Sequence, residues 1–218
     1  MKKLKANKVL ITLIAALFIV LISYSNIVSA QAPSVLKIGS SNGDVWDLQY
    51  RLNQLDYPVA IDGIYGYQTS SAVKKFQTNY GVINDGIVGP VTWRVVKKTS
   101  LSKNDFQLFT HLIYSEARGE PYQGQVAVGA VVLNRIDSEK FPNTLRDVIF
   151  QKDAFTAVND GQFWLTPNKT AETAALDAVR GWDPSQGALF YFNPNTATSA
   201  WIWSRPQILK IGNHIFTV

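Results

Sequence analysis

The chain has 218 residues, 46% hydrophobic and 17% charged, which suits one ordinary domain or two small ones and is not a disordered composition. It contains no cysteine, which excludes disulfides, thiolate zinc sites and cysteine nucleophiles. The formal net charge is +5, but residues 31–218 hold 17 basic and 16 acidic residues, so the charge gives no support for nucleic-acid binding.

Residues 1–30 have the pattern of a secretory signal peptide. Four lysines in the first eight residues precede an apolar run from Val9 to Ile22, and Val28-Ser29-Ala30 fits the small-residue rule for signal peptidase. We therefore expect cleavage after Ala30 and export of the remaining chain. The alternative is an uncleaved anchor, for which a run of 14 residues is short, since a bilayer needs about twenty.

An internal repeat with a period of 23 residues lies between Val35 and Lys98. Residues 62–66 with Thr69 match residues 85–89 with Thr92. In each copy an Asp-Gly pair indicates a tight turn, and the threonine is expected to cap a following helix, over 69–80 and 92–97. A further helix is expected over 43–55, where apolar side chains share one face. The sequence thus predicts a small module of three helices.

The segments GDVWDLQYRLNQLDY, DGIYGYQTSSAVKKFQ and DGIVGPVTW resemble the peptidoglycan-binding domain found beside many bacterial wall hydrolases. This resemblance implies that residues 31–98 bind peptidoglycan, although no single residue there indicates a sugar ligand. The short polar stretch at residues 99–104 is expected to be a linker, with a second domain over 105–218.

The second domain is organised around Glu116, which stands between two apolar segments. Apolar residues recur at helical spacing after a capping signal at Ser102, and Gly119 and Pro121 end that helix. Residues 125–134 are apolar almost all round, which is typical of a helix enclosed by its own domain. Glu116 is therefore expected in the last turn of a helix, against an apolar wall.

A carboxylate at an apolar wall has its charged form disfavoured by desolvation, so Glu116 could carry a proton near neutral pH. Such a proton donor suits glycosidic bond cleavage, as in lysozyme. The alternative interpretation is a solvated helix end, with Glu116 and Arg118 in a surface ion pair.

The rest of the second domain gives weaker signals. Residues 145–150 are expected to form a strand or a short helix, 160–161 a turn, 170–180 a helix, and 207–218 a closing strand. Aromatic residues between 190 and 203 lie beside asparagine, threonine and serine, a combination that suits sugars. Burial in the core is the alternative role for those rings.

Several chemistries lack their usual signals. The chain has only His111 and His214 as histidines, without the paired spacing of a zinc amidase, and it has no G-x-S-x-G elbow and no phosphate-binding glycine loop. We expect neither a metal nor a cofactor.

A hydrolytic glycosidase needs a second carboxylate, for which Asp153, Asp160, Asp177 and Asp183 are available. A lytic transglycosylase needs one acid, because the muramic C6 hydroxyl attacks the anomeric carbon.

The second domain closely resembles the catalytic domain of the spore cortex-lytic enzymes of endospore-forming bacteria, the SleB type of cell wall hydrolase. The resemblance is carried by residues 115–135, by FTAVNDGQ at 155–162 and by NPNTATSAWIWSRP at 193–206. It implies a mainly α fold, a three-helix peptidoglycan-binding module followed by a lysozyme-like α+β catalytic domain. It also implies that Glu116 is the catalytic acid of a lytic transglycosylase that degrades cortex at germination, leaving 1,6-anhydromuramic ends. The chain has Thr156-Ala157 where Ser-Cys is common in the family.

For substrate binding we expect Gln125, Tyr191, Asn193 and Trp201, with Arg118 and Glu120 as framing groups. Asn134 and Arg135 could equally be structural, as caps of the buried helix. The resemblance implies that cortex glycan strands are the partner, and it allows a membrane-anchored germination protein as a further partner. It also implies a location in the cortex, at the outer side of the inner spore membrane. The alternatives are a hydrolytic muramidase or glucosaminidase, a non-catalytic wall-binding protein and, with least support, an amidase.

Overall fold

The structure is a computed structural model that describes residues 33–218, so the expected signal segment at 1–30 lies outside the described residues. It is mainly α-helical with one small sheet, as expected. No helix within residues 33–218 is long and apolar enough to cross a membrane. The helices are α2 (Gly43–Gln54), α3 (Tyr67–Asn79), α4 (Pro90–Thr99), α5 (Lys103–Ala117), α6 (Tyr122–Asp137), α7 (Leu145–Ile149), α8 (Thr156–Asn159), the 3-10 helix η1 (Gln162–Trp164), α9 (Lys169–Val179) and α10 (Ala200–Trp203).

The three helices expected before residue 100 are present as α2, α3 and α4. They enclose one apolar core, whose largest fully buried side chains are Leu36, Leu48, Leu52, Tyr65, Phe76 and Trp93. The phenol of Tyr65 donates to the carbonyl oxygen of Gly86 at 2.8 Å, which ties the first copy of the repeat to the second.

The expectation that Thr69 and Thr92 cap helices is wrong. Helices α3 and α4 begin two residues earlier, and their N-caps are Gly66 and Gly89, without a side-chain cap. The threonines lie inside the first turns, where each hydroxyl accepts a hydrogen bond from a buried glutamine. Gln49 Nε2 donates to Thr69 Oγ1 at 3.2 Å, and Gln77 Nε2 makes the same bond to Thr92.

Those two glutamines explain why both copies of the repeat have the same turn residues. In each copy the glutamine amide also donates to the turn aspartate and to the carbonyl oxygen two residues beyond it, while its oxygen accepts from the backbone of the turn. Both side chains are buried, so the paired amides replace the water that the turns would otherwise bind. The glutamines are 28 residues apart rather than 23, which hid them from the repeat pattern.

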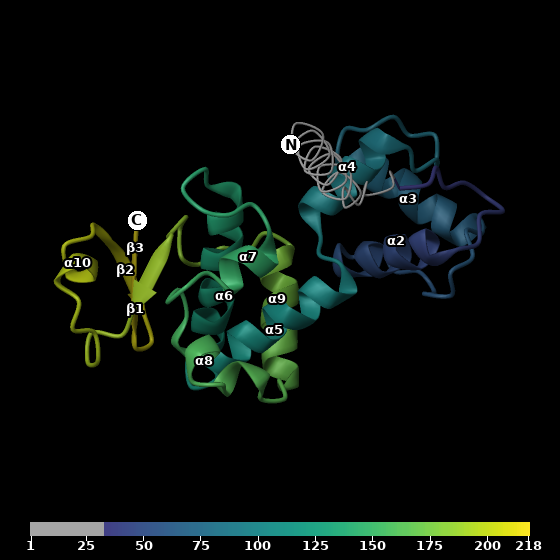
Figure 1. The fold of residues 1–218 in the computed structure, drawn as a ribbon. Helices are drawn as coiled ribbons and strands as arrows, with labels where there is room; N and C mark the ends of the chain where they lie inside the picture. The colour runs from purple at the N-terminus through teal and green to yellow at the C-terminus, as the bar shows by residue number, and fades with distance from the viewer. Residues whose placement is uncertain (1–32) are drawn as a thin grey trace, which may run out of the picture. The chain divides into compact units, whose positions relative to one another are not determined.

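In the second domain α5, α6 and α9 pack side by side, as Figure 1 shows in teal and green. Gly129 in the middle of α6 permits this close approach. A Cβ there would lie 2.8 Å from Ile113 Cδ1, 3.0 Å from Phe109 Cζ and 3.2 Å from Ala178 Cβ. Both α5 and α9 therefore press against bare backbone of α6.

The helix that carries Glu116 has the expected ends. Ser102 is the N-cap of α5, and its hydroxyl accepts from the backbone N–H of Asp105 at 3.1 Å. The helix ends at Ala117, so the prediction that Glu116 lies in the last turn is confirmed. Helix α6 is buried along most of its length, which confirms the enclosed helix, although it is longer than the expected 125–134.

The strands are β1 (Phe190–Phe192), β2 (Gln207–Ile211) and β3 (His214–Thr217), antiparallel in the order β1-β3-β2. The expected single closing strand over 207–218 is wrong, because Gly212 with φ 57° turns the chain between β2 and β3. Sequence analysis did not anticipate β1 or α10. In the register of the sheet Tyr191 lies opposite Phe216. Residues 145–149 form helix α7, so of the strand and the short helix expected for this segment the helix is confirmed.

The connection between α4 and α5 is short and is held against α2. Arg51 donates to the carbonyl oxygen of Ser100 at 3.0 Å. The Gln54 side chain both donates to and accepts from the backbone of Leu101, at 2.7 and 3.1 Å. The boundaries at 98, 99–104 and 105 stay a prediction.

Candidate active site

The carboxylate of Glu116 is held by two hydrogen bonds, one to each oxygen. The backbone N–H of Ala157 donates to Oε1 at 2.9 Å, and the phenol of Tyr191 donates to Oε2 at 2.9 Å. The side chain is half-buried at the end of α5. Two segments that are remote in sequence thus fix the orientation of this carboxylate.

The Ala157 donor is available because it lies in the first turn of α8, where backbone N–H groups have no partner within the helix. Any residue except proline supplies this N–H. The contact with Glu116 therefore does not depend on the side chains of Thr156 and Ala157.

The Tyr191 donor stays protonated. Burial raises the pKa of its phenol well above 10, and the nearby Glu116 carboxylate raises it further. The phenol is therefore a neutral donor at every pH where the fold is expected to work. Tyr191 was expected to bind substrate, and the hydrogen bond that the structure shows for its phenol is the one to Glu116.

His214 is a neighbour that sequence analysis considered only as an insufficient zinc ligand. It is buried on β3, and its ring centroid lies 5.0 Å from that of Tyr191. Its Nδ1 has no hydrogen-bond partner among residues 33–218. Burial lowers the pKa of His214, opposed by the negative charges of Glu120 and Glu116, so the ring is neutral at neutral pH. No local sequence pattern indicated it.

Glu120 joins the end of α5 to the β2–β3 turn. Its Oε2 accepts from the backbone N–H of Asn213 at 2.8 Å, and its Oε1 accepts from the Asn213 side-chain amide at 3.1 Å. A Cβ on Gly212 would collide with Glu120 Oε2, so glycine is required there for the close approach as well as for the turn. Both carboxylate oxygens are therefore engaged.

Two further residues expected at the site lie close to this end of α5. Gln125 is buried and donates to the carbonyl oxygen of Glu120 at 3.2 Å, while its own oxygen has no partner among the described residues. Arg118 is exposed and donates to the carbonyl oxygen of Ser115 and to the side chain of Gln162. No ion pair joins Arg118 to Glu116 within residues 33–218, so the surface-pair interpretation is not seen.

Asn193 and Trp201 follow β1, and within residues 33–218 neither forms a hydrogen bond with Glu116. The Asn193 side chain accepts from the backbone N–H of Asn195 at 2.9 Å, so it shapes the turn that follows β1. Trp201 in α10 is 54% exposed and meets Phe190 edge-on at 5.1 Å. The structure thus joins Tyr191 to Glu116 and Gln125 to Glu120 by hydrogen bonds, and shows no such bond from Asn193 or Trp201 to either glutamate.

The hydrogen-bond donors of Glu116 are Ala157 and Tyr191, and within residues 33–218 neither also binds one of the aspartates considered as a second carboxylate. Asp160 accepts from Gln162, Asp177 accepts from the phenol of Tyr122, and Asp183 accepts from Ser185 and Asn134, while Asp153 is exposed. No cluster of three or more histidine, aspartate or glutamate side chains suited to a metal ion occurs within residues 33–218.

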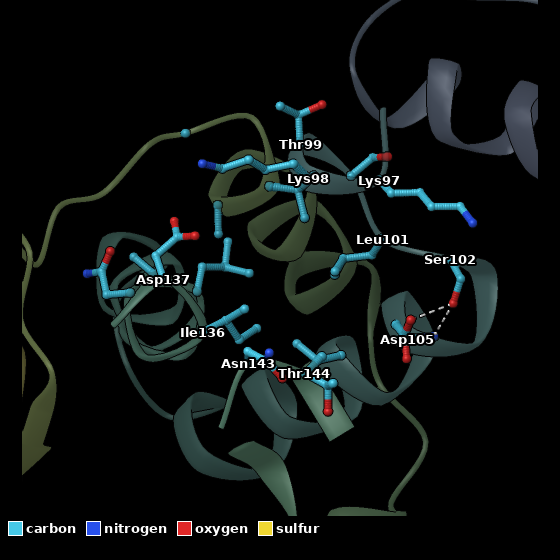
Figure 2. A pocket seen from close by; sticks show the side chains of 18 of the residues that line it. Lys97, Lys98, Thr99, Leu101, Ser102, Asp105, Ile136, Asp137, Asn143 and Thr144 are labelled. Carbon is cyan, nitrogen blue, oxygen red and sulfur yellow. Dashed lines mark hydrogen bonds between the residues drawn. The ribbon is translucent and has the colours of Figure 1, made fainter. Parts of the chain in front are cut away.

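The second domain also borders a cavity of about 750 Å³, and Figure 2 labels several of the residues that line it. It is lined by the α4–α5 connection, by α6 and by residues 143–146, with Lys98, Leu101 and Asp137 among its side chains. Neither Glu116 nor Tyr191 nor Ala157 lines it. The cavity is therefore separate from the carboxylate site.

Comparison with known proteins finds two families. The Cell Wall Hydrolase family matches residues 119–217, and the putative peptidoglycan binding domain family matches residues 41–96. A spore cortex-lytic enzyme of Bacillus cereus is 44% identical over 228 residues, covering 87% of this chain and 88% of the relative. One of Bacillus subtilis is 62% identical over 115 residues, covering 53% of this chain and 38% of the relative.

A solved structure also matches. The catalytic domain of the germination-specific lytic transglycosylase SleB from Bacillus anthracis is 63% identical, with a TM-score of 0.52, and the match covers 54% of this chain and 97% of that one.

Proposed function

Because this chain belongs to the spore cortex-lytic enzyme family, we propose that it is an exported lytic transglycosylase that degrades spore cortex peptidoglycan at germination. It cleaves the glycosidic bond between MurNAc and GlcNAc, and Glu116 is its catalytic acid. The observation that carries the assignment of the acid is the pair of donors, Ala157 and Tyr191, that fix both oxygens of this one carboxylate.

In the first step Glu116 gives its proton to the leaving glycosidic oxygen, and positive charge develops at the anomeric carbon. The two fixed donors then stabilise the carboxylate that remains, because hydrogen bonds to the charged form favour it. In the second step Glu116 takes the proton of the muramic C6 hydroxyl as that oxygen attacks the anomeric carbon. The product carries a 1,6-anhydro ring, and one residue serves as acid and then as base.

The geometry of Glu120 favours this chemistry over hydrolysis. A hydrolase needs a second carboxylate free to act as base or nucleophile. Glu120 is the nearest carboxylate in the sequence, but it is bound to the β2–β3 turn: Asn213 donates to both of its oxygens, and a Cβ on Gly212 would collide with Oε2. Glu116 differs because its two donors come from separate segments, α8 and β1, and not from one turn packed against it. Glu120 therefore stabilises the hairpin. A muramidase or glucosaminidase remains the second candidate function.

The finer assignments belong to the same proposal. The N-terminal module holds the enzyme on cortex glycan strands, and the signal segment directs export to the outer side of the inner spore membrane, where a membrane-anchored protein is the expected partner. These points are supported by the family resemblance and by the match of residues 41–96 to a peptidoglycan-binding domain.

The test is product analysis of purified cortex peptidoglycan digested by residues 31–218. We expect soluble fragments whose muramic ends lack one water and resist borohydride reduction, because a 1,6-anhydro ring has no free anomeric carbon. Reducible ends would instead establish the hydrolase. If the protein binds cortex peptidoglycan but releases no soluble fragments, the result would support a non-catalytic wall-binding protein.

Replacing Tyr191 with phenylalanine tests the phenol donor. A hydrogen bond to a charged group contributes about 1.5–3 kcal/mol, so we expect Tyr191→Phe to lower turnover about tenfold or more. Fragment release under saturating cortex measures this. The matched control is Tyr122→Phe, which removes a phenol that donates to Asp177, and it should leave turnover near wild type. Equal turnover for both variants would contradict the role of Tyr191.

A further inference from the structure

Arg135 in the last turn of α6 is a buried cation. Its side chain is 6% exposed, and within residues 33–218 it forms no ion pair with a carboxylate. A buried charge without a paired counter-ion is costly unless other groups stabilise it. The groups that surround Arg135 therefore indicate what it does.

The guanidinium lies among three aromatic rings. Its central carbon is 5.1 Å from the ring centroid of Phe141, 5.0 Å from that of Phe155 and 5.4 Å from that of Phe190. Its Nε donates to the carbonyl oxygen of Leu189 at 2.7 Å. Ring faces attract a cation, and a planar guanidinium stacks on them better than an ammonium does.

These contacts lie directly beside the two donors to Glu116. Phe155 is two residues before Ala157, whose N–H binds Oε1. Leu189 and Phe190 immediately precede Tyr191, whose phenol binds Oε2. One side chain thus holds both segments that orient the carboxylate.

Burial lowers the pKa of Arg135, because the charged guanidinium is removed from water. The groups that the structure places around this charge are the three ring faces and the carbonyl oxygen of Leu189. The cation is therefore stabilised by the same contacts that hold the two segments.

We propose that Arg135 is a positioning residue of the Glu116 site, which holds the Ala157 and Tyr191 segments in place. The inference deepens the proposed function and rests on it for the catalytic consequence. The alignment of the two donors does not depend on activity and can be tested without substrate.

Two variants remove the contacts of Arg135 in different ways. Arg135→Met keeps an apolar side chain in the space but removes the charge and the donor. Arg135→Lys keeps the charge but loses the planar group that stacks on three rings and binds Leu189. The matched control is Arg51→Met, since Arg51 is 7% exposed and lies on α2, outside the contacts of Glu116.

The substrate-free measurement is the backbone amide signal of Ala157 in ¹H–¹⁵N NMR spectra, since this N–H donates to Glu116 Oε1 at 2.9 Å. We expect the amide proton signal to move upfield in Arg135→Met and in Arg135→Lys, because loss of the stacking contacts lets the segment around Phe155 shift and lengthens this hydrogen bond. It should stay at the wild-type position in Arg51→Met.

An Ala157 signal at the wild-type position in both Arg135 variants would overturn the proposal, whatever the activity.

Kinetics test the catalytic consequence. We expect kcat on cortex fragments to fall about tenfold in Arg135→Lys with KM unchanged, because the donors lose their alignment while the glycan still binds. Wild-type kcat in Arg135→Lys would overturn the catalytic consequence, and that variant also serves if Arg135→Met does not fold. If wild-type protein releases no fragments but the Ala157 signal moves as expected, the proposed function fails and the positioning role stands.

Discussion

Replacing Glu116 with glutamine should abolish nearly all release of cortex fragments while leaving the fold intact. The amide has no proton to give and no basic oxygen to take one, and loss of a general acid–base group costs on the order of a thousandfold in rate. The fold should tolerate the change, because the glutamine oxygen can accept from the Ala157 N–H and the Tyr191 hydroxyl can accept from the new amide. Fragment release measured by mass spectrometry gives the rate.

The matched control for this variant is Glu172→Gln. Glu172 lies on the outer part of α9 in an exposed pair with Lys169, so its loss removes the same charge away from the site. Release should stay close to wild type there, and both variants should bind cortex peptidoglycan equally. Turnover by Glu116→Gln within threefold of wild type would remove Glu116 from the catalytic role.

The largest effect on stability is expected from Phe109→Ala. Phe109 is fully buried on α5, seven residues before Glu116, and its ring lies against the bare backbone of α6 at Gly129. Truncating such a ring removes transfer free energy and leaves a cavity, which costs about 3–5 kcal/mol. Since a domain is stable by only about 5–15 kcal/mol, this variant should unfold at much lower urea concentration, measured by circular dichroism.

Two comparisons give this prediction its scale. Phe109→Leu refills most of the space and should cost less than half as much. Tyr67→Ala changes a side chain that is 82% exposed on α3 and should alter the free energy of unfolding by no more than about 0.5 kcal/mol. A cost below about 1 kcal/mol for Phe109→Ala would show that α5 does not depend on this contact.

Sequence reasoning placed the helices because helix formation follows local patterns. The capping signal at Ser102 and the break after Ala117 are visible in short stretches of chain, and they are sufficient to put Glu116 in the last turn of α5. For the threonines of the repeat the local pattern was ambiguous, and their role was set by the buried side chains to which they bind. Thr69 and Thr92 resemble caps in sequence but bind glutamines instead.

Strands gave a weaker signal than helices. The segment β1 has three residues, too few for an alternation to be recognised, and the single predicted strand over 207–218 is a hairpin that turns at Gly212. The turn is required by an approach to Glu120, a residue more than ninety positions earlier in the chain. No local window contains both partners.

The sequence by itself determined that this chain has a peptidoglycan-binding module, a helical second domain and one distinctive glutamate at the end of a helix. Only the tertiary structure decided what surrounds that glutamate. Its two donors, Ala157 and Tyr191, are 41 and 75 residues away, and Arg135 acts on both through rings from separate segments. Periodicity and capping report contacts within a few residues, whereas an oriented carboxylate is assembled by packing between elements that the sequence keeps apart.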